Sequence, residues 1–169
     1  MGPIETDRLV LRRLTAGDAP FILELLNDPD WLRFIGDKGV RTLDDARNYI
    51  RTGPVESYAK HGFGLLLVEL RADRSRMGLC GLVRRDSLPG VDLGYAFLPP
   101  YRRNGYAVEA ASAVLRFARE SARLDRILAI TDPDNERSIR VLEKLDFAYE
   151  RRVRLSEGAE EISLYVRPL

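Results

Sequence analysis

Hydrophobic and polar positions along the chain follow two periods, one typical of β-strands and one typical of α-helices. Apolar or alternating runs predict strands at residues 9–14, 63–70, 77–84, 91–98, 126–131, 148–155 and 162–166. Apolar residues at helical spacing predict helices after Thr15, at about 42–60, at 104–123 and at about 133–145. The order β-α-α-β-β-β-α-β-α-β-β is typical of an α/β fold, with a mixed sheet and helices on both faces.

Proline-containing segments divide this pattern. Asp28-Pro29 is expected to stop the first helix, and Gly53-Pro54 to break or kink the second. The Leu88-Pro89-Gly90 turn joins two of the three consecutive strands between residues 63 and 98. These three strands are therefore expected to form an antiparallel meander.

The composition limits the class of protein. A length of 169 residues predicts one domain, residues 1–169. The net charge of +1 gives no general attraction to nucleic acid or to anionic membranes. No apolar run approaches the roughly 20 residues of a membrane span, and the chain starts without a recognisable signal peptide. We therefore expect a cytoplasmic protein without nucleic-acid or membrane partners.

The chain contains one cysteine, Cys80, and one histidine, His61. A single cysteine excludes an intramolecular disulfide and a cysteine-built zinc site, so no metal is expected. Any Ser-His-Asp triad would have to use His61. Its position beside Gly62 predicts a surface turn, and the apolar neighbours of Cys80 predict a place in the core.

Residues 93–107 predict a strand, a tight loop and the start of the long helix. A helix N-terminus presents unpaired backbone N–H groups and is a natural phosphate site. Gly105 would let the backbone turn sharply and approach a ligand. A plain structural corner is the alternative. No Walker lysine follows, and the G-x-G of Gly62 and Gly64 lacks a third glycine, which argues against nucleotide hydrolysis and a dinucleotide site.

The same loop resembles a known family. Arg102-x-x-Gly105-x-Ala107, after the Leu93-Gly94-Tyr95 strand, resembles the pyrophosphate-binding motif [RQ]-x-x-G-x-[GA] of the GNAT superfamily of N-acetyltransferases. Three further segments are similar to its ribosomal-protein N-terminal (Rim-type) branch: Thr6–Arg12, Tyr106–Ala110 and Asn135–Phe147. The resemblance implies the GNAT fold, a mixed and mostly antiparallel central sheet whose strands splay apart at the coenzyme site.

The resemblance also implies acetyl-CoA as cosubstrate. Backbone N–H groups from Arg103 to Ala107 would hold the pyrophosphate, and the pantetheine arm would pair with the free edge of the 93–98 strand. The implied coenzyme-binding residues are Phe97, Leu98, Arg102, Arg103, Asn104, Gly105, Tyr106, Ala107, Asn135 and Ser138. Helix capping is the alternative role for Asn135 and Ser138, and simple solvation is the alternative for the two arginines.

Three positions depart from the family pattern. Arg103 stands where glycine is common. Asp146 replaces the glycine that usually ends the last helix, a place that often needs a left-handed conformation, at a cost of roughly 1 kcal/mol for aspartate. Leu142 stands where many members carry a tyrosine that serves as general acid.

Acetyl transfer requires a neutral amine, so a group must accept the amine proton. Asp92, just before Leu93-Gly94-Tyr95, stands where several members of the superfamily place a carboxylate base. Ser138 is the second candidate catalytic residue. Glu109 is a competing carboxylate, although its place near a helix N-terminus explains it without catalysis. A backbone N–H of the 93–98 strand is expected to stabilise the oxyanion.

The resemblance favours the α-amine of a protein or peptide as acceptor, such as a ribosomal-protein N-terminus. A small-molecule amine (an amino acid, a polyamine or an aminoglycoside) is the alternative substrate. A coenzyme-binding regulatory module without turnover is the alternative class of function. The sequence does not name the acceptor, and a homodimer is compatible with it.

Overall fold

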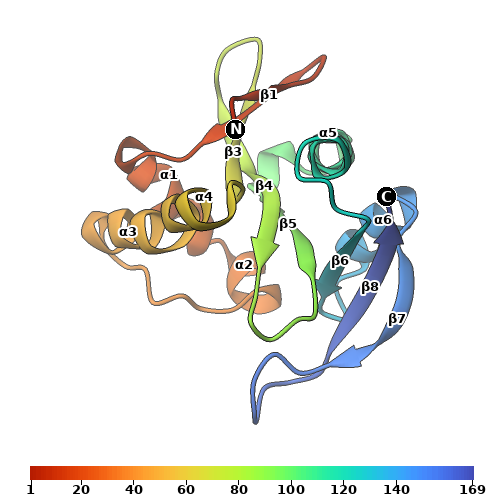
Figure 1. Ribbon diagram of the computed structural model, residues 1–169. Coiled ribbons are helices and arrows are strands. Elements are labelled where there is room, and N and C mark those ends of the chain that lie inside the picture. Colours follow the sequence, from red (N-terminus) through yellow and green to blue (C-terminus); the bar gives the residue numbers. More distant parts are fainter.

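A computed structural model describes residues 1–169. One eight-stranded sheet runs through the chain in the order β1-β2-β3-β4-β5-β6-β8-β7, and only the β5–β6 pair is parallel. The strands are β1 (Ile4–Glu5), β2 (Leu9–Arg13), β3 (Leu65–Leu70), β4 (Arg76–Arg84), β5 (Val91–Phe97), β6 (Arg126–Thr131), β7 (Ala148–Val153) and β8 (Ile162–Pro168). The expected mixed, mostly antiparallel sheet is confirmed (Figure 1).

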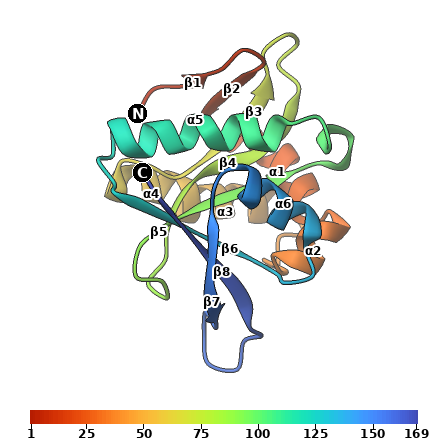
Figure 2. The same cartoon turned by 90° about the vertical axis from the view of Figure 1, so that its right-hand side faces the viewer.

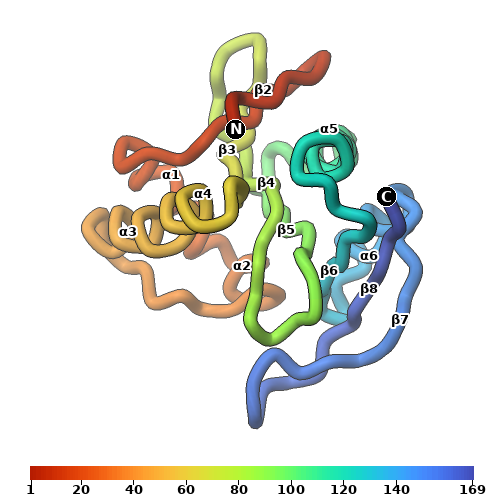
Figure 3. The backbone as a smooth tube through the Cα atoms, viewed as in Figure 1, coloured from red at the N-terminus to blue at the C-terminus, as the bar shows by residue number.

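Helices cover both faces of this sheet, as expected. They are α1 (Ala19–Leu26), α2 (Pro29–Phe34), α3 (Leu43–Ile50), α4 (Glu56–His61), α5 (Tyr106–Glu120) and α6 (Glu136–Lys144). Helices α1 to α4 gather on one side of β3 and β4, and α5 lies on the other, which the backbone path also shows (Figures 1 and 3). Helix α5 packs against β2, β4 and β5, running along that face (Figure 2). No helix is long and apolar enough to span a membrane.

The segment around Asp28-Pro29 corrects the sequence prediction. Helix α1 does end, at Leu26, but a further helix, α2, begins at Pro29. The Asp28 carboxylate accepts hydrogen bonds from the backbone N–H groups of Asp30 and Trp31. An aspartate followed by proline at the first helical position is a start signal as well as a stop signal. The predicted break at Gly53-Pro54 is a π-helical turn over Arg51–Val55 that joins α3 to α4.

Two apolar cores lie on opposite faces of the sheet. The larger one packs α5 and part of α6 against the strands, and Cys80 is buried in it, as expected. The smaller one packs α1, α2 and α3 against the other face and contains Trp31. The helices of the smaller core hold one wall of the functional site described below.

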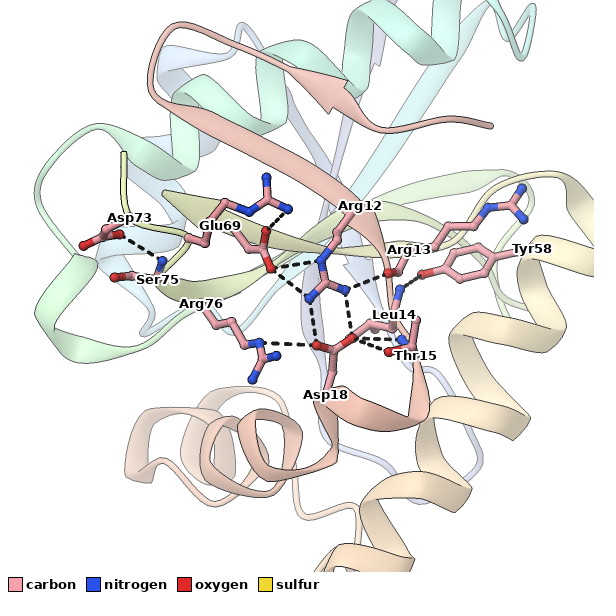
Figure 4. A network of polar contacts seen from close by, with 11 residues as sticks. Arg12, Arg13, Leu14, Thr15, Asp18, Tyr58, Glu69, Asp73, Ser75 and Arg76 are labelled. Atoms are coloured by element: carbon pink, nitrogen blue, oxygen red, sulfur yellow. Dashed lines mark hydrogen bonds and ion pairs between the residues drawn. The ribbon is translucent and has the colours of Figure 1, made fainter. Parts of the chain in front are cut away.

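A buried polar network fixes the first helix to the sheet (Figure 4). Arg12 of β2 donates to both carboxylate oxygens of Asp18 at 2.9 Å, and its Nε donates to Glu69 of β3 at 2.9 Å. Arg76 and Arg74 add further ion pairs to the two carboxylates. Both carboxylates are almost inaccessible to solvent, so the network satisfies charges that burial would otherwise make costly.

Candidate active site

Strands β5 and β6 pair at only one register position, Asp92 with Leu128, and then separate. A cleft of ≈ 1480 Å³ opens beyond that point. Small-molecule sites usually measure about 300–1,000 Å³, so this cleft has room for two ligands side by side. Residues from both faces of the sheet line the cleft. The cleft therefore passes from the α1–α4 side of the sheet to the α5–α6 side.

Strand β5 presents alternate side chains to these two sides. Leu93 and Phe97 belong to the core beneath α5, and Tyr95 packs against that core. Ala96 packs against the core beneath α1–α3, and Asp92 shares its face because the two positions differ by four. One strand therefore carries a carboxylate on one side of the cleft and a phenol on the other.

Asp92 is fully buried, with 0% exposure, and still lines the cleft. Nε of Arg85 donates to both of its carboxylate oxygens, at 3.1 and 3.2 Å. Burial disfavours the charged carboxylate more than the guanidinium favours it, so the pKa of Asp92 rises to about 6. A carboxylate with this pKa is ionised at pH 7 and is a better proton acceptor than an ordinary aspartate.

The loop before α5 presents unpaired donors. Among the hydrogen bonds of turns, loops and caps, none is donated by a backbone N–H from Arg103 to Ala107. Gly105 is the N-cap of α5, with a left-handed φ of 78°, and Arg103 also adopts a positive φ, 63°. Glycine adopts a positive φ without steric strain, so the backbone conformation at Arg103 explains why glycine is common at this position. Of these loop residues, Arg103, Gly105, Tyr106 and Ala107 line the cleft.

The two arginines of the loop differ. The guanidinium of Arg102 donates to Asp28 and Asp30 at 2.7 Å each, and its Nε donates to the carbonyl of Phe97 at 2.9 Å. This side chain therefore ties the loop to the start of α2 and is not free to bind a phosphate. Arg103 forms no ion pair and is exposed at the mouth of the cleft, so it is the loop arginine free to meet an anion.

Two residues of the expected coenzyme set do not line the cleft. Leu98 is buried in the core beneath α1–α3, and its backbone N–H donates to Met77. Both its side chain and its donor are thus used internally, which removes Leu98 from the candidates. Asn104 points away from the cleft: its carbonyl accepts from Arg8 and its side chain donates to the carbonyl of Arg102. Its backbone N–H has no partner within the loop.

Helix α6 brings Asn135 and Ser138 to the opposite wall. The side-chain oxygen Oδ1 of Asn135 accepts from the backbone N–H of Ser138 at 3.3 Å, so it caps the helix, while both residues line the cleft. The Ser138 hydroxyl lies 2.9 Å from the Tyr95 hydroxyl, which also lies 3.1 Å from the Ser138 carbonyl. Sequence reasoning missed Tyr95, because nothing in the Leu93-Gly94-Tyr95 motif indicates a partner 43 residues away.

The remaining chemical candidates lie elsewhere. Glu109 faces away from the cleft and accepts hydrogen bonds from the Thr6 hydroxyl at 2.6 Å and from Nε of Arg8 at 2.6 Å. These contacts hold the start of α5 against the N-terminal strands and rule out Glu109 as the base of this cleft. His61 lies at the rim, stacked on Phe63 with ring centroids 5.7 Å apart.

Comparisons with known proteins assign the family. The acetyltransferase (GNAT) domain model matches residues 8–148. The chain is 30% identical to the uncharacterized N-acetyltransferase YoaA of Bacillus subtilis over 148 residues, which cover 87% of this chain and 83% of that protein. An acetyltransferase from Agrobacterium tumefaciens superposes with a TM-score of 0.84 at 23% identity, over 99% and 94% of the two chains.

The fold is also similar to that of RimL, described as a ribosomal L7/L12 α-N-protein acetyltransferase and solved in complex with coenzyme A. That match has a TM-score of 0.83 at 15% identity and covers 99% of this chain and 98% of the other. GNAT enzymes use acetyl-CoA as the acetyl donor. Since the family model covers most of the sequence, the chain belongs to the GNAT family and is an N-acetyltransferase.

Proposed function

We propose that this enzyme transfers acetyl directly from acetyl-CoA to an α-amine, with Asp92 as the general base. The observation that carries the proposal is the position of Asp92: a buried carboxylate with a pKa of about 6, at the point where β5 and β6 separate. A perturbed titratable group in a large cleft is the strongest physical indication of a catalytic site.

The residues of the cleft fit coenzyme A. The unpaired N–H groups from Arg103 to Ala107, at the positive end of the α5 dipole, would hold its diphosphate. The edge of β5 beyond Asp92 has no strand beside it and offers backbone groups to an extended amide arm. Asn135 keeps its side-chain NH₂ free while its oxygen caps α6, and Arg103 supplies a free positive charge. When bound, acetyl-CoA supplies the activated thioester.

Asp92 lies on the α1–α4 face of β5, so the acceptor amine would enter from that side. The Asp92 carboxylate takes one proton from the ammonium, directly or through a water, and the neutral nitrogen then attacks the thioester carbonyl. Gly94 lines the cleft two residues further along the same face and leaves the strand backbone accessible there. Backbone N–H groups of β5 would stabilise the oxyanion of the tetrahedral intermediate.

Collapse of that intermediate breaks the C–S bond and leaves a thiolate that needs a proton. Ser138 is the nearest candidate donor on the α6 wall, and the Tyr95 hydroxyl at 2.9 Å can replace the proton that it gives up. Burial raises the pKa of Tyr95, so the phenol stays protonated at neutral pH and serves as a donor. This pair takes the role that the family's tyrosine would fill at Leu142, which is a buried core residue here.

The pKa of the base favours an α-amine over a lysine side chain. An α-amino group has a pKa of about 7.7–8.0, whereas a lysine ammonium has a pKa of about 10.4. Proton transfer to a base with a pKa of about 6 is therefore unfavourable by about two pKa units from an α-ammonium group and by about four from a lysine ammonium group. The structural similarity to RimL, an α-N-protein acetyltransferase, supports a peptide α-amine among the acceptors of this kind.

An acceptor panel tests the proposal. Release of free coenzyme A thiol and the mass of the product are measured with acetyl-CoA and three acceptors: a peptide with a free α-amine, the same peptide Nα-blocked but with a lysine, and a polyamine. We expect turnover with the first acceptor and at least tenfold lower kcat/KM with the other two. Equal rates with the polyamine or the lysine peptide would contradict the α-amine assignment. Thermal stabilisation by acetyl-CoA without thiol release would indicate a coenzyme-binding module instead.

A further inference from the structure

The half of the cleft on the α1–α4 side, here termed the acceptor end, has a distinct chemistry. Its walls come from α2, from the loop after it and from α3, and its floor is the Asp92 face of β4 and β5. Besides Asp92, the residues that line it include Trp31, Phe34, Lys38, Tyr49 and Arg85, of which Lys38 is the most exposed. Apolar rings and two cations therefore surround the proposed base.

Arg85 has hydrogen-bonding capacity to spare. Only its Nε contacts Asp92, and Nη1 and Nη2 take part in no hydrogen bond within the chain. The side chain is 33% exposed, so part of the guanidinium faces the cleft. A guanidinium that binds a carboxylate through one edge offers its two terminal nitrogens to a second anion close to the first.

Lys38 is the second cation of the acceptor end. It lies in the loop between α2 and α3 and pairs with no carboxylate, because its neighbour Asp37 is bound to Arg41 at 2.5 Å. Burial and then the positive charge of Arg85 lower the pKa of Lys38, and both side chains line the same cleft. Arg85 is balanced by Asp92 but Lys38 by no carboxylate, so this half of the cleft keeps a positive charge that an anionic ligand would balance.

The other groups of the acceptor end support this reading. Nε1 of Trp31 is buried and has no hydrogen-bond partner, and Trp31 is only 6% exposed. Burial raises the pKa of Tyr49, so this phenol, which also lines the cleft, stays a hydrogen-bond donor at neutral pH. The acidic residues that line this half besides Asp92 are Glu56 and Asp86, both at exposed positions, and Asp28 and Asp30 at the start of α2, both paired with Arg102. Apart from Asp92, the unpaired polar groups inside the acceptor end are therefore hydrogen-bond donors.

The geometry points to an acceptor that carries an anionic group, such as a carboxylate, within a few bonds of its reactive amine, with the amine at Asp92 and the anion between Arg85 and Lys38. This inference rests on the proposed function, because it uses Asp92 as the place of the amine. The short spacing follows from Arg85 contacting Asp92 through Nε while its terminal nitrogens stay free. A free α-amino acid and a peptide with an acidic first residue share this chemistry.

Matched acceptor pairs test the inference and distinguish a free α-amino acid from a peptide with an acidic first residue. Alanine is compared with alaninamide, and the C-terminally amidated tripeptide Asp-Ala-Ala with Asn-Ala-Ala. Every kcat/KM is expressed per unprotonated amine, because a nearby carboxylate raises the pKa of the amine. We expect the anionic member of one pair to have at least a tenfold higher kcat/KM, mainly through KM, and the pair that responds identifies the source. Differences below twofold in both pairs, or a preference for the neutral members, would overturn the inference.

A variant links the preference to the site. Lys38→Gln removes one of the two cations without touching Asp92, and it should reduce the ratio of kcat/KM for the anionic acceptor to kcat/KM for the neutral one at least fivefold. The matched control is Arg47→Gln, which removes an exposed cation of α3 that does not line the cleft. An advantage that survives Lys38→Gln unchanged, or that falls equally in both variants, would contradict the role of Lys38.

A binding measurement keeps the inference separate from the proposed function. If none of these acceptors is acetylated, the proposed function fails, but calorimetry with the same acceptor pairs in the presence of saturating coenzyme A still compares their affinities. Tighter binding of the anionic member, lost in Lys38→Gln, would support the anion site even then. Equal affinities within each pair would overturn it.

Discussion

Nε of Arg85 lies 3.1 and 3.2 Å from the two carboxylate oxygens of Asp92, so one guanidinium restrains the pKa of the fully buried carboxylate at the acceptor end. Burial raises this pKa, and the charge and hydrogen bonds of Arg85 lower it, with a balance at about 6. The pair thus sets the pH at which the proposed base becomes active.

Replacing Arg85 should move that pH. In Arg85→Met the lowering contribution is lost and burial remains, so the pKa of Asp92 rises above about 6. The acidic limb of the kcat/KM profile, measured with a neutral acceptor to leave anion binding aside, should move to higher pH than in the parent. An unchanged limb would show that Arg85 does not act on the group that titrates there.

Gly105→Val should weaken acetyl-CoA binding far more than it weakens the fold. A Cβ at position 105 would lie 3.4 Å from Nη2 of Arg8, and the branched side chain would disfavour the φ of 78° that shapes the loop of unpaired N–H groups. Gly158→Val is a matched control, because Gly158 has φ 77° in the open loop between β7 and β8. Both variants should lose a similar stability in urea unfolding, of about 1 kcal/mol, but only the first should lose affinity. Equal affinities would mean that the loop is a corner and not a binding site.

Tyr95→Phe and Ser138→Ala should both lower kcat with little change in the KM for acetyl-CoA. General acids contribute roughly 10²- to 10⁴-fold, and a relay that water can replace in part should lie at the lower end. If the two hydroxyls act as one chain, the double variant should be about as slow as the slower single variant. If the double variant instead loses the product of the two single-variant fold-changes in kcat, the two hydroxyls act independently, which would contradict a shared path for the proton.

Arg12→Met should destabilise the fold without affecting the site. It leaves Asp18 and Glu69 buried with weaker partners, which is expected to cost about 3 kcal/mol at pH 7. Burial raises the pKa of Asp18, but the hydrogen bonds and charge of Arg12 outweigh it and lower that pKa below its ordinary value. A lowered carboxylate pKa stabilises the fold above the unfolded pKa of about 3.9. The loss should therefore shrink as the pH falls below about 4, as measured by urea unfolding; a pH-independent loss would contradict this origin.

Elements that are determined by residues close together in the sequence were predicted from the sequence. Strand β6 has the predicted bounds, Arg126 and Thr131, because a short apolar run between turns determines it. Asp146 takes the left-handed conformation expected at the end of the last helix, with φ 60°. Helix α2 was missed because Asp28-Pro29 signals an end and a start equally.

Contacts between distant segments were not predictable in this way. Arg102 belongs to a binding motif, and no local pattern shows that its guanidinium pairs with Asp28 and Asp30, more than 70 residues earlier. The same holds for Tyr95 and Ser138, which meet only because β5 and α6 form opposite walls of one cleft. The motif indicated a site, but the partner of each side chain depends on the folded arrangement.

The most direct test of the central claim is the pH profile of kcat/KM for the parent and for Asp92→Asn with an α-amine acceptor. The parent rate should rise with pH as Asp92 ionises near pH 6 and the amine loses its proton. A positioned general base contributes roughly 10²- to 10⁴-fold, so Asp92→Asn should be at least tenfold slower at pH 7. It should regain part of that loss at high pH, where free amine accumulates, and it should bind acetyl-CoA with parental affinity. A parental rate at every pH would contradict the assignment of Asp92 as the base.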